Sequence, residues 1–283
     1  MSRRDARSLW LSQNLFDDLQ FPLHTVTASS SPVGNEFWRV ATGRRAAIDA
    51  WAPPTENSTQ WGAVDCATPR PANLLVIDRG HNLTLSGGGF YLEGRSSTAQ
   101  SWTVVVQSTS VPSVVGPAPS TTAWGAPTYE GALVREFPTT VFRHWRLRVP
   151  PSTGYAPVIR NMALGQAWIP SEPAVGPSDW DATQVNYDET VTPSGWRGTG
   201  RVALTREGAA MYRLTSFGEY ETSRRHMQEY QQGRISWYVP QRGRAELAMC
   251  VQIPAVRMPA PQEPGNIFRT LSLPYREHQP LPL

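Results

Sequence analysis

Short apolar runs separated by loops rich in proline and glycine dominate the chain between residues 35 and 168. Residues 73–80 (NLLVIDRG) begin with a continuous apolar run, which is typical of a strand covered on both faces, and residues 101–109 (SWTVVVQST) repeat that character. Residues 157–168 (PVIRNMALGQAW) end the region with a further predicted strand. Many short strands joined by Gly/Pro turns predict a sandwich or a barrel.

Residues 140–149 (TVFRHWRLRV) alternate between two faces, as a half-buried strand does. One face carries Phe142 and then three basic residues, His144, Arg146 and Arg148. We assign the three basic residues to a candidate assembly interface. The opposite, apolar row is interrupted by Arg143 and consists of Val141, Trp145, Leu147 and Val149.

A second region follows a proline-rich stretch. Residues 219–233 (EYETSRRHMQEYQQG) have the strongest helical period in the chain, with Tyr220, Met227 and Tyr230 near one face and Gly233 suited to end the helix. The segments on either side of it read as strands. We therefore predict a smaller β-rich (α+β) module with one helix.

The first residues are predicted to form an arm. Residues 8–19 (SLWLSQNLFDDL) suggest a short helix, and the following residues suggest extended chain. Trp10, Phe16 and Phe21 must pack on something, either the chain's own body or a neighbouring subunit, and both alternatives stay open. We assign these three aromatic residues to the candidate assembly interface.

The fold class is thus mainly β, with a β-sandwich followed by the smaller β-rich module. The predicted boundaries are an arm at 1–34, the sandwich at 35–169, a linker at 170–182, the second module at 183–274 and a tail at 275–283.

The charged residues of the chain indicate which kinds of binding partner to expect. All 26 basic side chains are arginine, either through codon bias in a GC-rich genome or through selection for bidentate ion pairs. Because 23 acidic residues leave a net charge of only +3, we expect no nucleic-acid partner.

No stretch approaches the roughly 20 apolar residues of a membrane span, and no secretion signal is evident. Cys66 and Cys250 are expected to be reduced and buried.

Motifs for catalysis are missing from the sequence. Gly87, Gly88 and Gly89 lack the spacing of a phosphate loop, and the five histidines are dispersed, without the spacing of metal ligands. We expect no enzyme activity, no cofactor and no metal. The competing hypothesis is a glycosidase that uses Asp179 and Asp181, which lie in the proline-rich linker.

His81 follows the turn residues Asp78-Arg79-Gly80 at the exit of the predicted strand at 73–80. A catalytic base, a metal ligand and a structural residue are the alternatives. We favour a structural histidine that forms a hydrogen bond with the backbone at the strand exit.

The stretches WRVAT (38–42), PANLLVIDRGHNL (71–83), TVVVQST (103–109), RHWRLRV (143–149) and PVIRNMALGQAW (157–168) resemble discoidin-like, galactose-binding-type jelly rolls in their order. In particular, NLLVIDRGHNL is similar to a phrase of such domains in tail-tip proteins of tailed bacteriophages. The resemblance covers residues 35–168 and implies a jelly-roll β-sandwich with loops gathered at one end.

The resemblance implies a structural virion protein of a phage tail tip or baseplate, made in the host cytoplasm. It would assemble as a homo-oligomeric ring or collar that joins the tail tube to hub or receptor-binding components, with other tail and baseplate proteins as partners.

The alternative implied by the resemblance is a glycan-binding module for host-surface carbohydrate. Eleven tryptophans are unusually many, and Trp61, Trp124 and Trp180 lie in predicted loops, where they either pin the loops or stack on sugar rings. The candidate ligand-binding residues are Trp61, Arg95 and Trp124, because tryptophan suits the C–H face of a pyranose and arginine suits hydroxyls and carboxylates.

Overall fold

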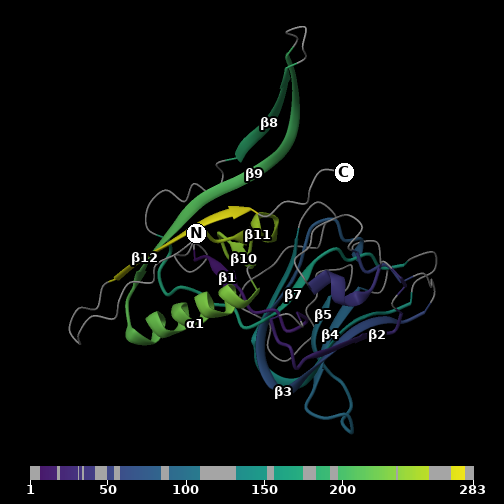
Figure 1. Cartoon of the computed structure of the whole chain (residues 1–283). Coiled ribbons are helices and arrows are strands. Elements are labelled where there is room, and N and C mark those ends of the chain that lie inside the picture. Colours follow the sequence, from purple (N-terminus) through teal and green to yellow (C-terminus); the bar gives the residue numbers. More distant parts are fainter. Residues whose placement is uncertain are drawn as a thin grey trace.

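The structure, a computed structural model, is mainly β with one α-helix among the residues that it describes, which confirms the predicted fold class. Two six-stranded sheets form the two modules (Figure 1). The described residues are 7–17, 20–30, 32–33, 35–41, 50–53, 58–83, 89–108, 132–151, 156–174, 183–191, 197–233, 235–254 and 269–277.

The first sheet forms the module that the sequence predicts as a β-sandwich. Its order is β2-β3-β6-β4-β5, and β7 also pairs with β3. The two long strands β3 and β6 pair antiparallel from Gln60↔Val149 to Ile77↔Leu133, so they run through the whole module. The strands are β2 (Thr25–Ala28), β3 (Gln60–Ile77), β4 (Phe90–Arg95), β5 (Thr103–Ser108), β6 (Leu133–Val149) and β7 (Met162–Gly165). The strands predicted at 73–80, 101–109, 140–149 and 157–168 each overlap an observed strand, namely β3, β5, β6 and β7.

The alternation predicted for residues 140–149 holds only in part. Trp145, Leu147 and Val149 are buried in the core as expected, but Val141 is 53% exposed and Phe142 packs against the core instead. The reason is a register shift between the Asp65↔His144 and Arg70↔Phe142 pairs. A bulge of this kind reverses which side chains face inward.

Ala67 lies in this bulge, with a left-handed φ of 58°. Asp65 Oδ1 accepts a hydrogen bond from the Ala67 N–H at 2.9 Å and so supports the bend. The bulge thereby fixes Asp65 at the edge of the face described below.

The second sheet has the order β1-β10-β11-β12-β9-β8. The helix α1 (Phe217–Gly233) covers one of its faces, where Tyr220 and Met227 pack against the strands. The predicted helix is confirmed and begins two residues earlier, after Ser216, whose hydroxyl accepts the Glu219 N–H. The strands are β1 (Leu9–Leu11), β8 (Thr183–Val191), β9 (Arg197–Leu214), β10 (Ser236–Val239), β11 (Met249–Gln252) and β12 (Arg269–Glu277). Two short 3-10 helices, η2 (Phe37–Ala41) and η4 (Ala245–Leu247), complete the described elements.

The prediction of a helix over residues 8–19 is wrong. Residues 9–11 form β1, an edge strand of the second sheet that pairs antiparallel with β10. A strand places Leu9 and Leu11 on one side and Trp10 on the other, and each side meets a different apolar cluster. The helix could not cover both clusters, so tertiary packing overrides the local pattern.

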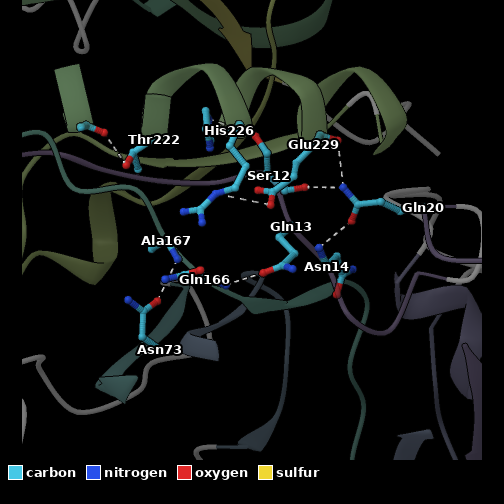
Figure 2. A network of polar contacts seen from close by, with 12 residues as sticks. Ser12, Gln13, Asn14, Gln20, Asn73, Gln166, Ala167, Thr222, His226 and Glu229 are labelled. Atoms are coloured by element: carbon cyan, nitrogen blue, oxygen red, sulfur yellow. Dashed lines mark hydrogen bonds and ion pairs between the residues drawn. The ribbon is translucent and has the colours of Figure 1, made fainter. Parts of the chain in front are cut away.

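The N-terminal segment joins the two modules. Leu9 and Leu11 lie in a cluster that combines Leu74 of the first sheet with Trp237 of the second. Polar side chains continue this connection, as Figure 2 shows: Ser12 reaches His226 of α1, whereas Gln13 accepts the backbone N–H of Gln166 at 2.7 Å. The arm therefore packs on the chain's own body.

A two-stranded ribbon leaves this body. Strand β8 and the first half of β9 pair with each other from Thr183↔Arg206 to Val191↔Arg197, and they extend away from both modules (Figure 1).

A candidate ligand-binding cleft on the first sheet

The candidate site lies on the face of the first sheet that points away from its core. Cross-strand pairing places Asp65 of β3 beside His144 of β6, and His144 beside Arg95 of β4. One step along the strands, Arg146 of β6 lies beside Glu93 of β4. Because successive side chains alternate between faces, this polar set shares one surface while their neighbours fill the core.

The face is hollowed into a cleft with a volume of about 410 Å³. This volume falls within the range of small-ligand sites, roughly 300–1,000 Å³. The side chains that matter for its chemistry are Trp61, Asp65, Arg95, Trp102, His144 and Arg146.

Glu93 anchors the basic row of β6. Glu93 is 3% exposed, and its carboxylate forms ion pairs with Arg146 at 2.6 Å and with Arg148 at 2.9 Å. Paired arginines lose much of their rotamer freedom, so this ion-pair network fixes the basic row in position.

Asp65 and His144 lie together at one end of the cleft. Arg143 donates to both Asp65 oxygens, at 2.8 and 2.9 Å, and these hydrogen bonds lower the pKa of the Asp65 carboxyl. Burial lowers the pKa of His144, and the charges of Arg95 and Arg143 lower it further against the opposing effect of Asp65. His144 is therefore neutral at pH 7, with ring nitrogens suited to accept or donate hydrogen bonds.

Trp102 holds two arginines by cation–π contacts. The guanidinium carbons of Arg95 and Arg146 lie 4.3 and 4.2 Å from its ring centroid. Trp61 differs from Trp102, because its ring contacts no other aromatic ring or cation among the described residues. Its partly exposed ring is thus available to a ligand.

The structure brings together two of the three ligand-binding residues predicted from the sequence. Trp61 and Arg95 both line the cleft, although Trp61 belongs to strand β3 rather than to the predicted loop. Trp124 lies outside the described residues, as do Trp180, Asp179 and Asp181.

Sequence reasoning missed Trp102, Asp65 and Glu93 as members of the site. Trp102 directly precedes the apolar run of β5 and has the pattern of that strand, so nothing in the sequence marks it as a ligand-binding residue. The signal that was present is the alternation of β4, where Glu93 and Arg95 share one face of a strand that is otherwise apolar.

The candidate assembly residues fall into two groups. Trp10 and Phe16 are buried within their own chain, at 0% and 1% exposure, and Phe21 packs on the first core, so the arm packs on the chain's own body, which is one of the two alternatives left open by the sequence. His144 and Arg146 line the cleft, and Arg148 lies beside it, paired to Glu93. A role of this basic row in assembly stays a prediction.

His81 has the predicted structural position. It is fully buried, and its Nδ1 accepts the backbone N–H of Leu83 at 3.3 Å after the turn at Gly80, whose φ is +83°. Both cysteines are free and buried, as expected. Burial raises the pKa of the Cys66 thiol to about 12, so it stays protonated.

Ser12 and His226 form a serine–histidine contact, at 3.1 Å between Oγ and Nε2. The adjoining cavity has a volume of about 20 Å³, which is room for about one water molecule and no larger substrate. Burial lowers the pKa of His226 to about 3, which makes it a weak base. This pair therefore belongs to the polar network between the N-terminal segment and α1.

The described residues contain no group of three or more His, Cys, Asp or Glu side chains that could hold a metal ion. In the same part of the chain, no helix is both long and apolar enough to cross a membrane.

No protein-family model matches the sequence, and no curated protein matches it. Among solved structures, the chain is similar to chitosan-binding module 1 of a chitosanase/glucanase from Paenibacillus sp., with 17% identity and a TM-score of 0.39, over 54% of this chain and 98% of that one. It is also similar to a fucose-binding module of Streptococcus pneumoniae, with 13% identity and a TM-score of 0.36, over 54% of this chain and 96% of that one.

A fucosidase of Ruminococcus gnavus in complex with fucose has 11% identity and a TM-score of 0.39, over 55% of this chain but only 27% of that one. These structural neighbours are carbohydrate-binding modules or an enzyme that acts on sugar, and none of the three is a phage protein.

Proposed function

We propose that the protein binds a carbohydrate in the cleft on the outer face of the first sheet. The observation that carries this proposal is the convergence of an uncovered tryptophan ring, Trp61, with the planar polar groups of Arg95 and His144 in one cleft. Sugars present an apolar C–H face to aromatic rings, and their hydroxyl pairs suit forked donors and acceptors.

The side chains of the cleft are held in position before a ligand arrives. Trp61, Asp65, Arg95, His144 and Arg146 come from neighbouring strands, whose backbone is fixed by sheet pairing. Arg146 is further held by the Glu93 carboxylate and the Trp102 ring, so a ligand does not have to order it.

The tail-tip role implied by the sequence resemblance stays a separate prediction. Carbohydrate binding does not depend on that role and would serve host attachment if the protein proves to be a virion component.

A glycan array tests the proposal. We expect saturable binding to a related set of glycans by the full chain and its loss in the Trp61→Ala variant. Trp38→Ala is the matched control, because Trp38 is a 39% exposed tryptophan that does not line the cleft. A full chain that binds no glycan, or a Trp61→Ala variant that binds as well as the unmodified chain, would contradict the proposal.

A further inference from the structure

Among the residues that the structure describes, the ion pairs around the cleft leave one arginine without a carboxylate. Glu93 pairs with Arg146 and Arg148, and Asp65 pairs with Arg143. Together with Arg95, four arginines therefore face two carboxylates. Among the described residues, Arg95 forms no ion pair at all.

The hydrogen bonds of Arg95 are also incomplete. Its Nη1 donates to the backbone carbonyl of Thr98 at 3.3 Å, which is a long hydrogen bond. Its Nε is buried and has no hydrogen-bond partner in the described part of the chain. Arg95 therefore has one weak hydrogen bond and no ion pair among the described residues, so its guanidinium keeps the capacity to pair with an incoming anion.

The surroundings orient Arg95 toward the cleft. Its guanidinium lies over the Trp102 ring, and its strand position pairs with His144, which also lines the cleft. The fork of an arginine matches the two oxygens of a carboxylate, and the pair is strongest where a site is partly desolvated. Asp65 is already held by Arg143, so it does not compete for Arg95.

We propose, on the basis of the carbohydrate-binding function above, that the ligand is an acidic glycan whose carboxylate pairs with Arg95. In this arrangement a pyranose ring lies against Trp61, and the sugar's carboxylate supplies the anion that the described residues do not provide. Uronic acids and sialic acids are the sugars that carry this group.

Matched pairs of probes separate this inference from the proposed function. Oligogalacturonides, oligoglucuronides and 3′-sialyllactose are each titrated calorimetrically into the full chain at low ionic strength, beside the methyl ester of the same compound. We expect at least one acid to bind 10-fold or more tightly than its ester, because esterification removes the charge and little else.

Variants of Arg95 then test whether this residue causes the preference for the acid over its ester. Arg95→Gln is expected to bring the acid and its ester to nearly equal affinity, whereas Arg95→Lys keeps the charge without the fork and retains part of the preference. Arg224→Gln makes the same change in net charge on the exposed surface of α1 and is expected to leave the preference unchanged.

Each outcome decides between the two proposals. Equal binding of acids and esters, or an acid preference that survives Arg95→Gln, overturns the inference and leaves carbohydrate binding intact. If neither the acids nor the esters bind but a neutral glycan of the array does, the inference alone is overturned. If no glycan of any kind binds, both proposals are wrong.

Discussion

Trp10 and Trp168 exchange two backbone hydrogen bonds, from Trp10 N–H to the Trp168 carbonyl at 2.9 Å and from Trp168 N–H to the Trp10 carbonyl at 2.8 Å. Through this bridge the N-terminal segment joins the chain that leaves the first module. The Trp10 ring then stacks on Tyr238 of the second sheet, with centroids 4.1 Å apart. One residue thus holds contacts with both modules.

Trp10→Ala is expected to lower the free energy of unfolding by about 3–5 kcal/mol, the usual cost of truncating a fully buried aromatic residue. The change also removes the donor that the Trp10 indole provides to the Tyr212 hydroxyl at 2.8 Å. Denaturant unfolding measures the loss, with the exposed Trp38→Ala as the control. A loss below 1 kcal/mol would show that Trp10 is not part of the core.

Deletion of residues 1–12 separates an intrachain role of the N-terminal segment from a subunit contact. Because this deletion removes β1 and opens the Leu74–Trp237 cluster, we expect the truncated chain to lose cooperative unfolding. Light scattering and thermal unfolding are measured on the same samples. A truncated protein that stays cooperatively folded while a larger oligomer dissociates would instead identify the segment as a clamp between subunits.

Glu93→Gln tests the ion-pair network of the cleft. The change leaves Arg146 and Arg148 without their buried carboxylate, and breaking a buried pair typically costs about 3–5 kcal/mol. Glu221→Gln is the matched control, because Glu221 pairs with Arg224 on the exposed helix surface and should cost less than about 1 kcal/mol. Similar losses in the two variants would contradict a supporting role of Glu93.

Trp102→Ala is expected to weaken ligand binding by 10-fold or more without unfolding the protein. The reason is that Arg95 and Arg146 lose the ring that positions them, while the partly exposed Trp102 contributes less to the core than Trp10 does. Calorimetric titration with the best glycan of the array measures the change, and circular dichroism checks the fold. Unchanged affinity would remove Trp102 from the site.

The sequence predicted the strands and the helix well because their periods reflect burial on a sheet or against it. Residue type alone marked Trp61 and Arg95 as candidates, whereas their expected loop position is wrong, because both lie in strands. What the sequence could not supply is the neighbour of each residue across the sheet. Glu93, Asp65 and Trp102 belong to the cleft through pairing between strands that are distant in sequence.

Two local patterns misled the prediction for a related reason. The 8–19 segment has a helical spacing of leucines, but it runs between two modules and needs apolar side chains on opposite sides. Val141 continues an apolar row in the sequence, but the bulge at Asp65–Arg70 turns it outward. Both errors come from tertiary contacts that override a local period.

Acid sensitivity is expected from His226, whose pKa is lowered from 6.5 to about 3, mainly by burial and to a smaller extent by Arg225. Between these two pH values the unfolded chain binds a proton that the folded chain does not. The contribution of His226 to the free energy of unfolding is therefore fully present above pH 6.5. It falls as the pH decreases, by about 2 kcal/mol at pH 5.

His226→Gln removes this titration while keeping a side chain that reaches Ser12 and can form a hydrogen bond with it. We expect the variant to be somewhat less stable than the unmodified chain at pH 7 but to lose less stability between pH 7 and pH 5. Urea unfolding at a series of pH values measures both curves. Because other groups titrate equally in both proteins, the difference between the curves reports His226. Parallel curves over this range would mean that the buried histidine does not control the acid response.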